Sequence, residues 1–296
     1  MMKTKHKQKY QFSGLIYILP WILGFLVLQL IPLINSMIYS FTDFSMIGKS
    51  HFVGISNYAK AFKTQEFWNS LKVTFFYVLM AVPCKIAFAL LIAIILNQKI
   101  KGINFFRTLY YLPSILGGSV AISILWKYLF MQKGIINGLL LKIGIHGPDW
   151  LGNPSFALPT IGLVTVWQFG SSMLLFLAGL KNIPTCLYEA AEIDGARTLR
   201  KFASITLPEL SPIVLFNLIM QMINAFQEFT PAYVITQGGP LKSTYLYGLM
   251  LYDQGFKFFK MGYASALSWI LFVIIMIFTS MTFGSSQSWV HYGDQT

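Results

Sequence analysis

The sequence is organised as long apolar runs separated by shorter polar segments. Six runs are long enough to cross a membrane, since a helix of about 20 apolar residues spans the hydrocarbon core. They lie at about 13–38, 70–96, 112–130, 156–180, 209–235 and 259–283. The pattern predicts an all-α integral membrane protein, with one domain of six transmembrane helices over 13–283 and a short C-terminal tail at 284–296.

The first apolar run is predicted to remain in the mature protein. Lys3, Lys5, Lys7 and Lys9 precede it, an arrangement that imitates a secretory signal. The run is longer than the apolar part of a signal sequence and lacks a small-residue cleavage site. We therefore interpret it as an uncleaved first span that follows a short tail, 1–12.

The most hydrophilic connection, 181–208, separates the fourth and fifth runs. Pro184 suits the first position of a helix, and the residues up to Ile193 are good helix formers. Gly195 predicts a change of direction, because glycine adopts left-handed backbone conformations without steric cost. A second short helix is expected to stop before Pro208, whose ring and missing N–H disfavour continuation. The segment is thus predicted to be a helical hairpin that faces an aqueous compartment.

The hairpin contains a motif with a recognisable spacing. Its members are Glu189, Ala190, Ala191, Asp194, Gly195 and Ala196, followed by Ile205, Leu207 and Pro208. This spacing resembles the cytoplasmic coupling loop of permease subunits of binding-protein-dependent ABC importers, in the carbohydrate-uptake branch of maltose and multiple-sugar type. Two later stretches, 236–240 and 262–268, resemble the same family. The resemblance implies the type I ABC importer permease fold, with a coupling helix between spans four and five.

The resemblance also implies a role for the motif residues. In such permeases the hairpin docks into a cytoplasmic ATPase subunit, with Glu189 making a polar contact and Ala190 and Ala191 allowing close approach. Gly195, directly after Asp194, sets the turn. Composition alone would instead favour an ordinary solvated hairpin. With the motif, we expect these five residues to couple the permease to the ATPase.

An assembly is implied as well. One coupling loop serves one ATPase subunit, so we expect a second related permease, identical or different, and two ATP-binding subunits that carry ATP and Mg. An extracytoplasmic solute-binding protein is expected to deliver a carbohydrate, and we expect this carbohydrate to be an oligosaccharide. The chain itself is expected to bind no cofactor and not to be an enzyme.

Composition and charge indicate the location. Hydrophobic residues make up 55% of the chain and charged residues 11%, which is typical of a membrane protein. The net charge of +12 does not indicate nucleic-acid binding, because the basic residues are dispersed at the ends of apolar runs. Arg107, Arg197 and Arg200 all fall in inner segments if the N-terminus is inside. We therefore expect a multi-pass protein of the cytoplasmic membrane with its N-terminus and hairpin in the cytoplasm.

Motifs for catalysis or metal binding are missing from the sequence. The four histidines are scattered through terminal and loop regions, and Cys84 and Cys186 are too few for a disulfide framework. The nearest approach to a phosphate-binding loop is 238–244, but Leu241 stands where glycine must precede the lysine. An integral membrane enzyme is therefore not expected, and ATP hydrolysis belongs to another chain.

The candidate substrate pathway comes from helical periodicity in the fifth run. Four polar residues share one helix face within about 60°. They are Asn217, Gln221, Asn224 and Glu228, spaced i, i+4, i+7 and i+11. Such a stripe faces either a water-filled cavity or polar partners on neighbouring helices. We favour a cavity in which these side chains, with Gln168 and Ser172 of the fourth run opposite, bind sugar hydroxyl groups.

One lysine lies inside an apolar run. Lys85 should face protein, water or a partner, because a charge near the bilayer centre costs about 2.5–3.5 kcal/mol on insertion scales. It either lines the pathway, is neutralised or paired within the helix bundle, or snorkels inward. Coupling of Lys85 to Glu228 would also suit an ion-driven secondary transporter, the alternative to an ATP-driven importer. That alternative leaves the hairpin motif unexplained.

Overall fold

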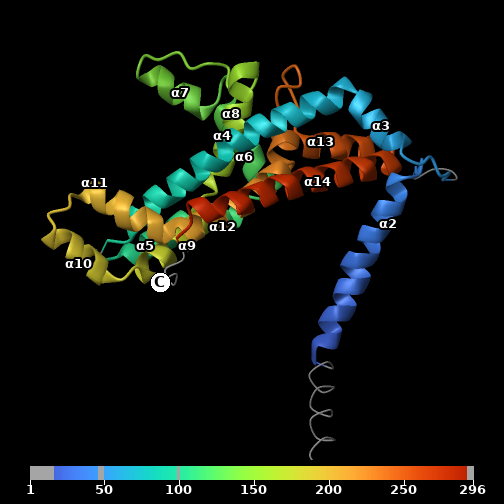
Figure 1. The fold of residues 1–296 in the computed structure, drawn as a ribbon. Coiled ribbons are helices and arrows are strands. Elements are labelled where there is room, and N and C mark those ends of the chain that lie inside the picture. The colour runs from blue at the N-terminus through green and yellow to red at the C-terminus, as the bar shows by residue number, and fades with distance from the viewer. Residues whose placement is uncertain (1–16, 46–49, 99–100, 292–296) are drawn as a thin grey trace, which may run out of the picture. The chain divides into compact units, whose positions relative to one another are not determined.

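The computed structural model describes residues 17–45, 50–98 and 101–291. The predicted tail 1–12, the start of the first span and the end of the C-terminal tail lie outside these ranges. Regular structure in the described ranges is helical, apart from an isolated antiparallel bridge between Thr42 and Phe52 (Figure 1). The expected all-α class is confirmed.

The helices are of three kinds. The α-helices are α2 (Ile31–Ser40), α3 (Ser56–Lys63), α4 (Gln65–Leu96), α5 (Ile103–Leu116), α6 (Val120–Phe130), α7 (Ile135–Lys142), α8 (Pro154–Trp167), α9 (Gly170–Asn182), α10 (Thr185–Ile193), α11 (Thr198–Lys201), α12 (Leu207–Phe226), α13 (Tyr247–Tyr252) and α14 (Met261–Ser285). The π-helical turns are η1 (Leu26–Leu30), η2 (Phe202–Thr206), η3 (Ala232–Thr236) and η4 (Asp253–Lys257), and a 3-10 turn, η5, covers Ser286–Ser288.

The described residues form two compact units. The first contains the chain up to Lys63 together with Leu251–Ile270, and the second contains Thr64–Met250 and the chain from Leu271 onward. α14 contributes its first part to one unit and its remainder to the other. The hairpin and all candidate pathway residues belong to the second unit.

In the first unit, the C-terminal end of α2 meets the N-terminal end of α14. Asn57 Nδ2, on α3, donates to the backbone oxygens of Ser40 at 2.9 Å and Thr42 at 2.8 Å. Gly262 N, on α14, donates to Phe44 O at 2.8 Å. A Cβ atom at Gly262 would collide with the backbone of this turn, so glycine is what permits the close approach.

Helix length and hydropathy agree with the expected number of spans. Four helices are long and apolar enough to cross a membrane alone: Tyr17–Ser40, Gln65–Leu96, Thr198–Phe226 and Met261–Ser288. Two bent pairs pass the same test together, giving six spans if each pair counts as one. They are Ile103–Leu116 with Val120–Lys142, bent by 100°, and Pro154–Trp167 with Gly170–Asn182, bent by 47°.

The third predicted span, 112–130, differs from the single helix expected. The chain breaks at Gly117 and Gly118, which lack side chains to pack and leave the backbone free to turn. Ser119 then starts α6, because its Oγ accepts a hydrogen bond from Ile122 N at 3.3 Å. The two halves therefore run in different directions.

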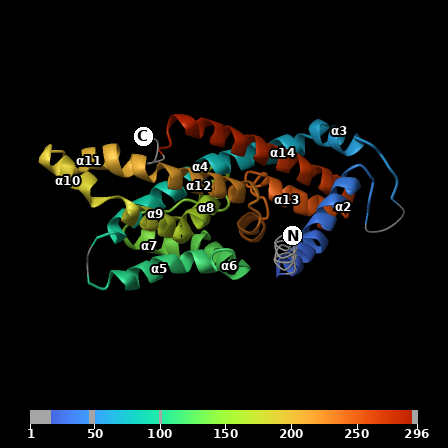
Figure 2. The same cartoon turned by 60° about the horizontal axis from the view of Figure 1, so that its bottom comes forward.

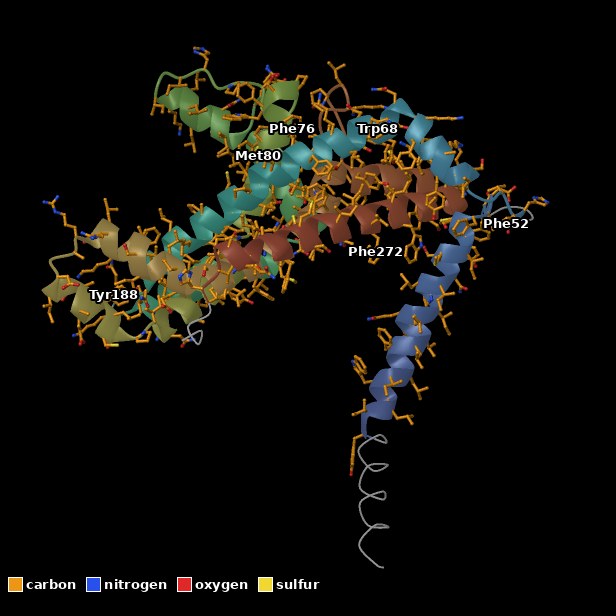
Figure 3. All side chains as sticks on the ribbon, in the orientation of Figure 1. Phe52, Trp68, Phe76, Met80, Tyr188 and Phe272 are labelled. Atoms are coloured by element: carbon orange, nitrogen blue, oxygen red, sulfur yellow. The ribbon has the colours of Figure 1, made fainter. Side chains whose placement is uncertain are left out.

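Close packing around α4 forms the core of the second unit. α4 packs against α8, α9 and α12. Ala81, Ala89 and Ala93 are buried on α4, and small residues of this kind let membrane helices approach closely. A Cβ atom at Gly162 of α8 would collide with Met80 of α4, which is labelled in Figure 3. Small residues therefore bring α4 and α8 together.

The second arm of the hairpin does not stop before Pro208, contrary to the sequence prediction. α11, η2 and α12 form one continuous helix, Thr198–Phe226. The π turn η2 lies directly before the proline, and Leu207 N donates to Phe202 O. Its wider turn accommodates the missing N–H and the ring of proline, which would disrupt a regular α-helix. The hairpin is thereby joined directly to a transmembrane helix.

Candidate functional site

The turn expected at Gly195 joins α10 to α11. Gly195 has a φ of +73°, a left-handed conformation that favours glycine. Its backbone N donates to Glu192 O at 3.0 Å, and Ala196 N donates to Ala191 O at 2.8 Å. These two bonds form a Schellman motif, which satisfies the last carbonyl groups of α10. We call α10, α11 and this turn the coupling hairpin.

The coupling hairpin projects from the second unit where α9 leads into it and α12 leaves it (Figures 1 and 2). The exposed motif residues are Glu189, Ala190, Asp194 and Gly195, and Ala191 is partly covered. Two large apolar side chains flank the turn: Ile193 is 88% exposed and Leu199 is 83% exposed. Both apolar side chains are therefore open to contact with another protein.

Side-chain contacts hold the hairpin and its stem together. Lys201 Nζ lies 2.6 Å from Glu192 Oε1, which joins the second arm to the first. The hydrogen bond and the charge of Lys201 lower the pKa of the Glu192 carboxyl group below its ordinary value. Tyr188, which is labelled in Figure 3, lies on α10, and its Oη is 2.9 Å from Thr206 Oγ1. The hairpin is therefore fixed to the helix that continues into the membrane.

The polar stripe lies only partly on one helix. Asn217, Gln221 and Asn224 belong to α12, and their exposure rises in that order from buried to exposed. α12 ends at Phe226, so Glu228 follows in non-helical chain and does not occupy the i+11 position assumed from the sequence. The first three side chains share a helix face, whereas the position of Glu228 depends on the tertiary structure.

Asn217 Oδ1 on α12 and Ser172 Oγ on α9 are among the buried side-chain oxygens of the second unit that have no hydrogen-bond partner in the described residues. The amide nitrogen of Asn217 donates to Ile213 O at 3.1 Å. α9 and α12 pack so closely that a Cβ atom at Gly179 would collide with Ile213. Asn217 lies about 6 Å beyond this contact along α12, and Ser172 lies about 10 Å beyond it along α9. Both positions are on the side of the contact away from the hairpin. The two unpaired acceptors therefore lie at similar depths.

Gln168 fastens the two bent helix pairs to each other. Its Nε2 donates to Gly117 O at 2.7 Å, and its backbone oxygen accepts a bond from Ser114 Oγ at 3.1 Å. Ser114 Oγ also accepts a bond from Ser171 N at 3.0 Å. The Gln168 amide is thus engaged in protein structure, and its expected contact with substrate stays a prediction.

A buried polar cluster links α4, α8 and the chain after α12. Tyr77 Oη lies 2.5 Å from Thr165 Oγ1, which donates to Glu228 Oε2 at 3.4 Å. Lys85 on α4 is only 7% exposed, and no carboxylate oxygen of the described residues lies within 4.0 Å of its Nζ. Lys85 is therefore enclosed by the helix bundle, and its role in the pathway or in the bundle stays a prediction.

The sequence analysis did not identify Tyr77 and Thr165. Thr74 lies three residues before Tyr77, and Gln168 lies three residues after Thr165, so polar residues at helical spacing were the signal that could have found both. Both are buried, and a buried hydroxyl group needs a hydrogen-bond partner. The partner comes from another helix, so the cluster emerges only when α4 and α8 pack together.

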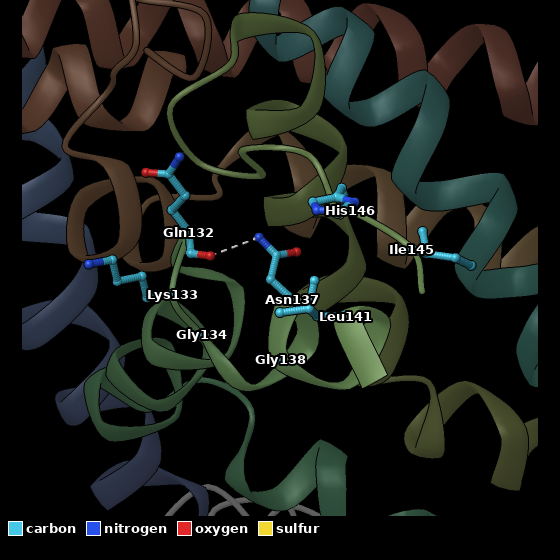
Figure 4. A pocket seen from close by; sticks show the side chains of 9 residues that line it. Gln132, Lys133, Gly134, Asn137, Gly138, Leu141, Ile145 and His146 are labelled. Atoms are coloured by element: carbon cyan, nitrogen blue, oxygen red, sulfur yellow. Dashed lines mark hydrogen bonds between the residues drawn. The ribbon is translucent and has the colours of Figure 1, made fainter. Parts of the chain in front are cut away.

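The connection between α6 and α8, predicted as a loop, contains α7 and a cavity of about 360 Å3 (Figure 4). Gln132, Lys133 and His146 line it together with three glycines. Asn137 Nδ2 donates to Gln132 O at 3.0 Å and Pro148 O at 3.1 Å, and its Oδ1 accepts a bond from Trp150 Nε1 at 2.7 Å. Asn137 therefore fixes the fold of this connection.

Over the described ranges, no group of three or more His, Cys, Asp or Glu side chains is placed to hold a metal ion. Cys84 and Cys186 are free thiols. The side chains of the site supply hydrogen-bond donors and acceptors, together with the buried Lys85 and the partly buried Glu228. Such groups suit binding and movement of a polar solute, in line with a transport role.

Comparison with known proteins gives a family. The family described as "binding-protein-dependent transport system inner membrane component" matches residues 53–290 of this chain. The chain is 49% identical to the probable ABC transporter permease protein YesP of Bacillus subtilis (strain 168), over 99% of this chain and 96% of that protein. It is 37% identical to the arabinooligosaccharides transport system permease protein AraP of the same organism, over 87% of this chain and 83% of that one.

A solved structure shares the fold. A chain of a bacterial alginate ABC transporter, in complex with an alginate pentasaccharide-bound periplasmic protein, matches with a TM-score of 0.81 and 19% identity over 96% of each chain. The family match covers most of the sequence, and the relatives are similar over nearly their whole length. The chain therefore belongs to the family of binding-protein-dependent transport system inner membrane components, which are multi-pass transport subunits and not enzymes.

Proposed function

We propose that this chain is the membrane-spanning subunit of an ATP-driven ABC importer that translocates a carbohydrate, specifically an oligosaccharide, delivered by an extracytoplasmic binding protein. The observation that carries the proposal is the exposed coupling hairpin, whose apolar tip residues Ile193 and Leu199 lie in water without a partner in the described chain. The relative AraP, named for arabinooligosaccharides, supports the substrate class.

The hairpin has the structure of a lever. Its first arm follows α9, and its second arm is continuous with α12, so a displacement of the hairpin is transmitted to both helices. α12 carries Asn217, Gln221 and Asn224, while α9 carries Ser172. Docking of Glu189, Ala190, Ala191, Asp194 and Gly195 into an ATPase subunit would therefore move the polar side chains when ATP binds, which is rigid-body alternating access.

The proposal includes the composition of the complex. One hairpin engages one ATPase subunit, so two ATP-binding subunits, which hold ATP and Mg, require a second permease with a hairpin of its own. With the N-terminus inside, the hairpin is cytoplasmic, where ATP is available. The opposite face would receive the solute-binding protein.

The proposed pathway uses the amides of Asn217, Gln221 and Asn224, with Ser172 opposite. Asn217 Oδ1 and Ser172 Oγ are acceptors without partners in the ranges described, and a sugar hydroxyl or water would satisfy them. Ion-coupled transport is the weaker candidate, because Glu228 is already bound by Thr165. Gln168, engaged with Gly117, would position the helices around the pathway.

Co-purification tests the coupling part of the proposal. The tagged chain is isolated from its native membrane in mild detergent, and the associated proteins are identified by mass spectrometry. An ATP-binding subunit and a second permease are expected with the wild type. Glu189→Lys should lose the ATP-binding subunit and keep the second permease, because the charge change lies on the docking surface alone.

Glu209→Lys is the matched control, since Glu209 is also exposed but lies at the start of α12 beyond the hairpin. It should retain the ATP-binding subunit. Retention of this subunit by both variants would contradict the role of Glu189. A chain that purifies alone under all nucleotide conditions would contradict the ATP-driven mechanism.

A further inference from the structure

Three lysines of the first unit lie over aromatic rings at or just before the start of α14. Lys60 Nζ, on α3, lies 5.1 Å from the ring centre of Tyr263 on α14. Lys257 and Lys260 lie with their Nζ atoms 5.8 and 5.7 Å from the ring centre of Phe258. All three lysines are exposed, and aromatic rings hold ammonium groups by cation–π attraction. We call Lys60, Lys257 and Lys260 the lysine cluster.

Acidic residues are scarce in the described part of the first unit. The described part of the first unit contains only Asp43 and Asp253 as acidic residues. Asp43 accepts a bond from His51 N at 2.5 Å, so it is engaged elsewhere. Asp253 Oδ1 lies 4.0 Å from Lys257 Nζ, at the limit of an ion pair. Lysines therefore outnumber acidic residues in the described part of this unit.

The position of the cluster relative to the membrane follows from the helices it borders. α2 ends at Ser40 and α14 begins at Met261, and the two ends meet at Gly262. Lys257 and Lys260 immediately precede α14. The headgroup layer is only about 5–7 Å deep on each side of a hydrocarbon core of about 30 Å. Lysines within one turn of a span end therefore lie at the depth of the lipid phosphates.

Exposed apolar side chains belong to the same segments of the first unit as the lysines. Phe52, labelled in Figure 3, is 79% exposed, and Ile55, Phe256 and Phe259 are also exposed. Large apolar groups in contact with water are unfavourable, but at the membrane interface they enter the acyl region. A surface with cationic groups at phosphate depth and apolar groups beside them matches a phospholipid better than the water-exposed face of a protein.

We propose that the lysine cluster binds the phosphate group of an anionic phospholipid in the leaflet at this end of α2. In the proposed orientation this is the outer leaflet, where lysines run against the usual distribution of positive charge in membrane proteins. The lipid would hold α3 and the first turn of α14 together through Lys60 and Lys260. The proposal requires the chain to be embedded in a membrane and is independent of the transported solute.

Native mass spectrometry of the complex, released from nanodiscs of equal parts phosphatidylglycerol and phosphatidylcholine, tests the proposal. The number of retained phosphatidylglycerol molecules is compared for the wild type and the triple variant Lys60→Gln/Lys257→Gln/Lys260→Gln. Each lysine near an anionic surface strengthens binding about fivefold, so the triple variant should bind phosphatidylglycerol on the order of a hundredfold more weakly. The matched control, Lys127→Gln/Lys133→Gln/Lys142→Gln, removes three lysines from α6–α7 and should bind like the wild type.

Each other outcome overturns the proposal. Equal retention of phosphatidylglycerol by both triple variants shows that the cluster is not a lipid site. Equal loss in both shows only a general effect of charge. If the cluster variant keeps its lipid but loses stimulation of ATP hydrolysis by the solute-binding protein, the surface faces that protein. Thermal unfolding midpoints of all variants in detergent show whether a variant loses lipid because it is misfolded. If the triple variant has a lowered midpoint, the single variant Lys60→Gln is used in its place.

Discussion

Lys201 Nζ lies 2.6 Å from Glu192 Oε1 and connects the two arms of the coupling hairpin across the Gly195 turn. Both residues lie close to the turn, so the ion pair and the Schellman bonds restrain the same few residues. A hairpin held in this way can transmit a push from a partner to α12 without bending. The rigidity of the turn is therefore open to direct test.

The ion pair predicts a pH dependence of the turn. The pKa of Glu192 is lowered in the folded hairpin, so the contribution of the pair is present above the ordinary carboxyl pKa of about 4.3 and is lost as the pH falls through the lowered value. Hydrogen exchange at the Gly195 and Ala196 amides, corrected for intrinsic rates, should increase in that window. Glu192→Gln should show the faster exchange already at pH 7 and no further acid response; acid responses of equal size in both proteins would contradict this explanation.

The Gly195 turn predicts a difference between two substitutions. Gly195→Ala forces a left-handed conformation on a residue with a Cβ atom, at a cost of about 1–2 kcal/mol, whereas asparagine tolerates it better. We expect Gly195→Ala to lower the ratio of solute uptake to ATP hydrolysis several-fold. Gly195→Asn should retain most of the ratio. Because no side chain lies within 4 Å of the position, crowding cannot account for the difference.

The hydrogen bond from Gln168 to Gly117, which joins the two bent helix pairs, predicts different results at two adjacent glycines. A Cβ atom at Gly117 would overlap the Gln168 side chain and break its 2.7 Å hydrogen bond, and overpacking of this kind costs about 1–3 kcal/mol. A Cβ atom at Gly118 meets nothing within 4 Å. The thermal unfolding midpoint in detergent should therefore fall for Gly117→Ala and stay near the wild-type value for Gly118→Ala. Equal midpoints for the two variants would contradict a role of the Gln168 hydrogen bond in holding the bent helix pairs together.

The buried cluster predicts a double-mutant cycle. Lys85→Met and Glu228→Gln each remove one of two opposite charges in the bundle, and a charge in an apolar surrounding is unfavourable without compensation, so each single variant should lower the unfolding midpoint. The double variant removes both charges and should be more stable than either single variant. Unfolding midpoints and the folded fraction after gel filtration measure the coupling, and strictly additive losses would show that the two residues do not interact.

Uptake by the same double variant separates pairing from ion coupling. If Lys85 and Glu228 serve only the structure, ATP-dependent uptake should survive in the variant that lacks both charges. An ion-driven mechanism requires that uptake stops while the protein stays folded. Intact folding with complete loss of transport would therefore support the alternative mechanism.

Much of the fold follows from the sequence. Six apolar runs of membrane-spanning length indicate the class, because backbone polar groups in lipid are satisfied only within helices or closed barrels. The coupling hairpin is equally local: Gly195, the adjacent helix formers and the motif spacing suffice to identify it. Local backbone preferences and solvent exposure decide both features, and neither depends on distant residues.

Other features depended on the tertiary structure. The 100° bend after Gly117, the continuation of a helix through Pro208 and the end of α12 before Glu228 each depart from a regular helical period. Gln168 illustrates the reason: its amide is occupied by a carbonyl group 51 residues earlier in the chain, a partner that no periodicity indicates. The sequence determined which segments enter the membrane and which segment projects into water, because hydrophobicity and turn preference are local properties. Packing alone decided which buried polar groups meet, since a hydrogen bond between helices depends on where both helices break and cross.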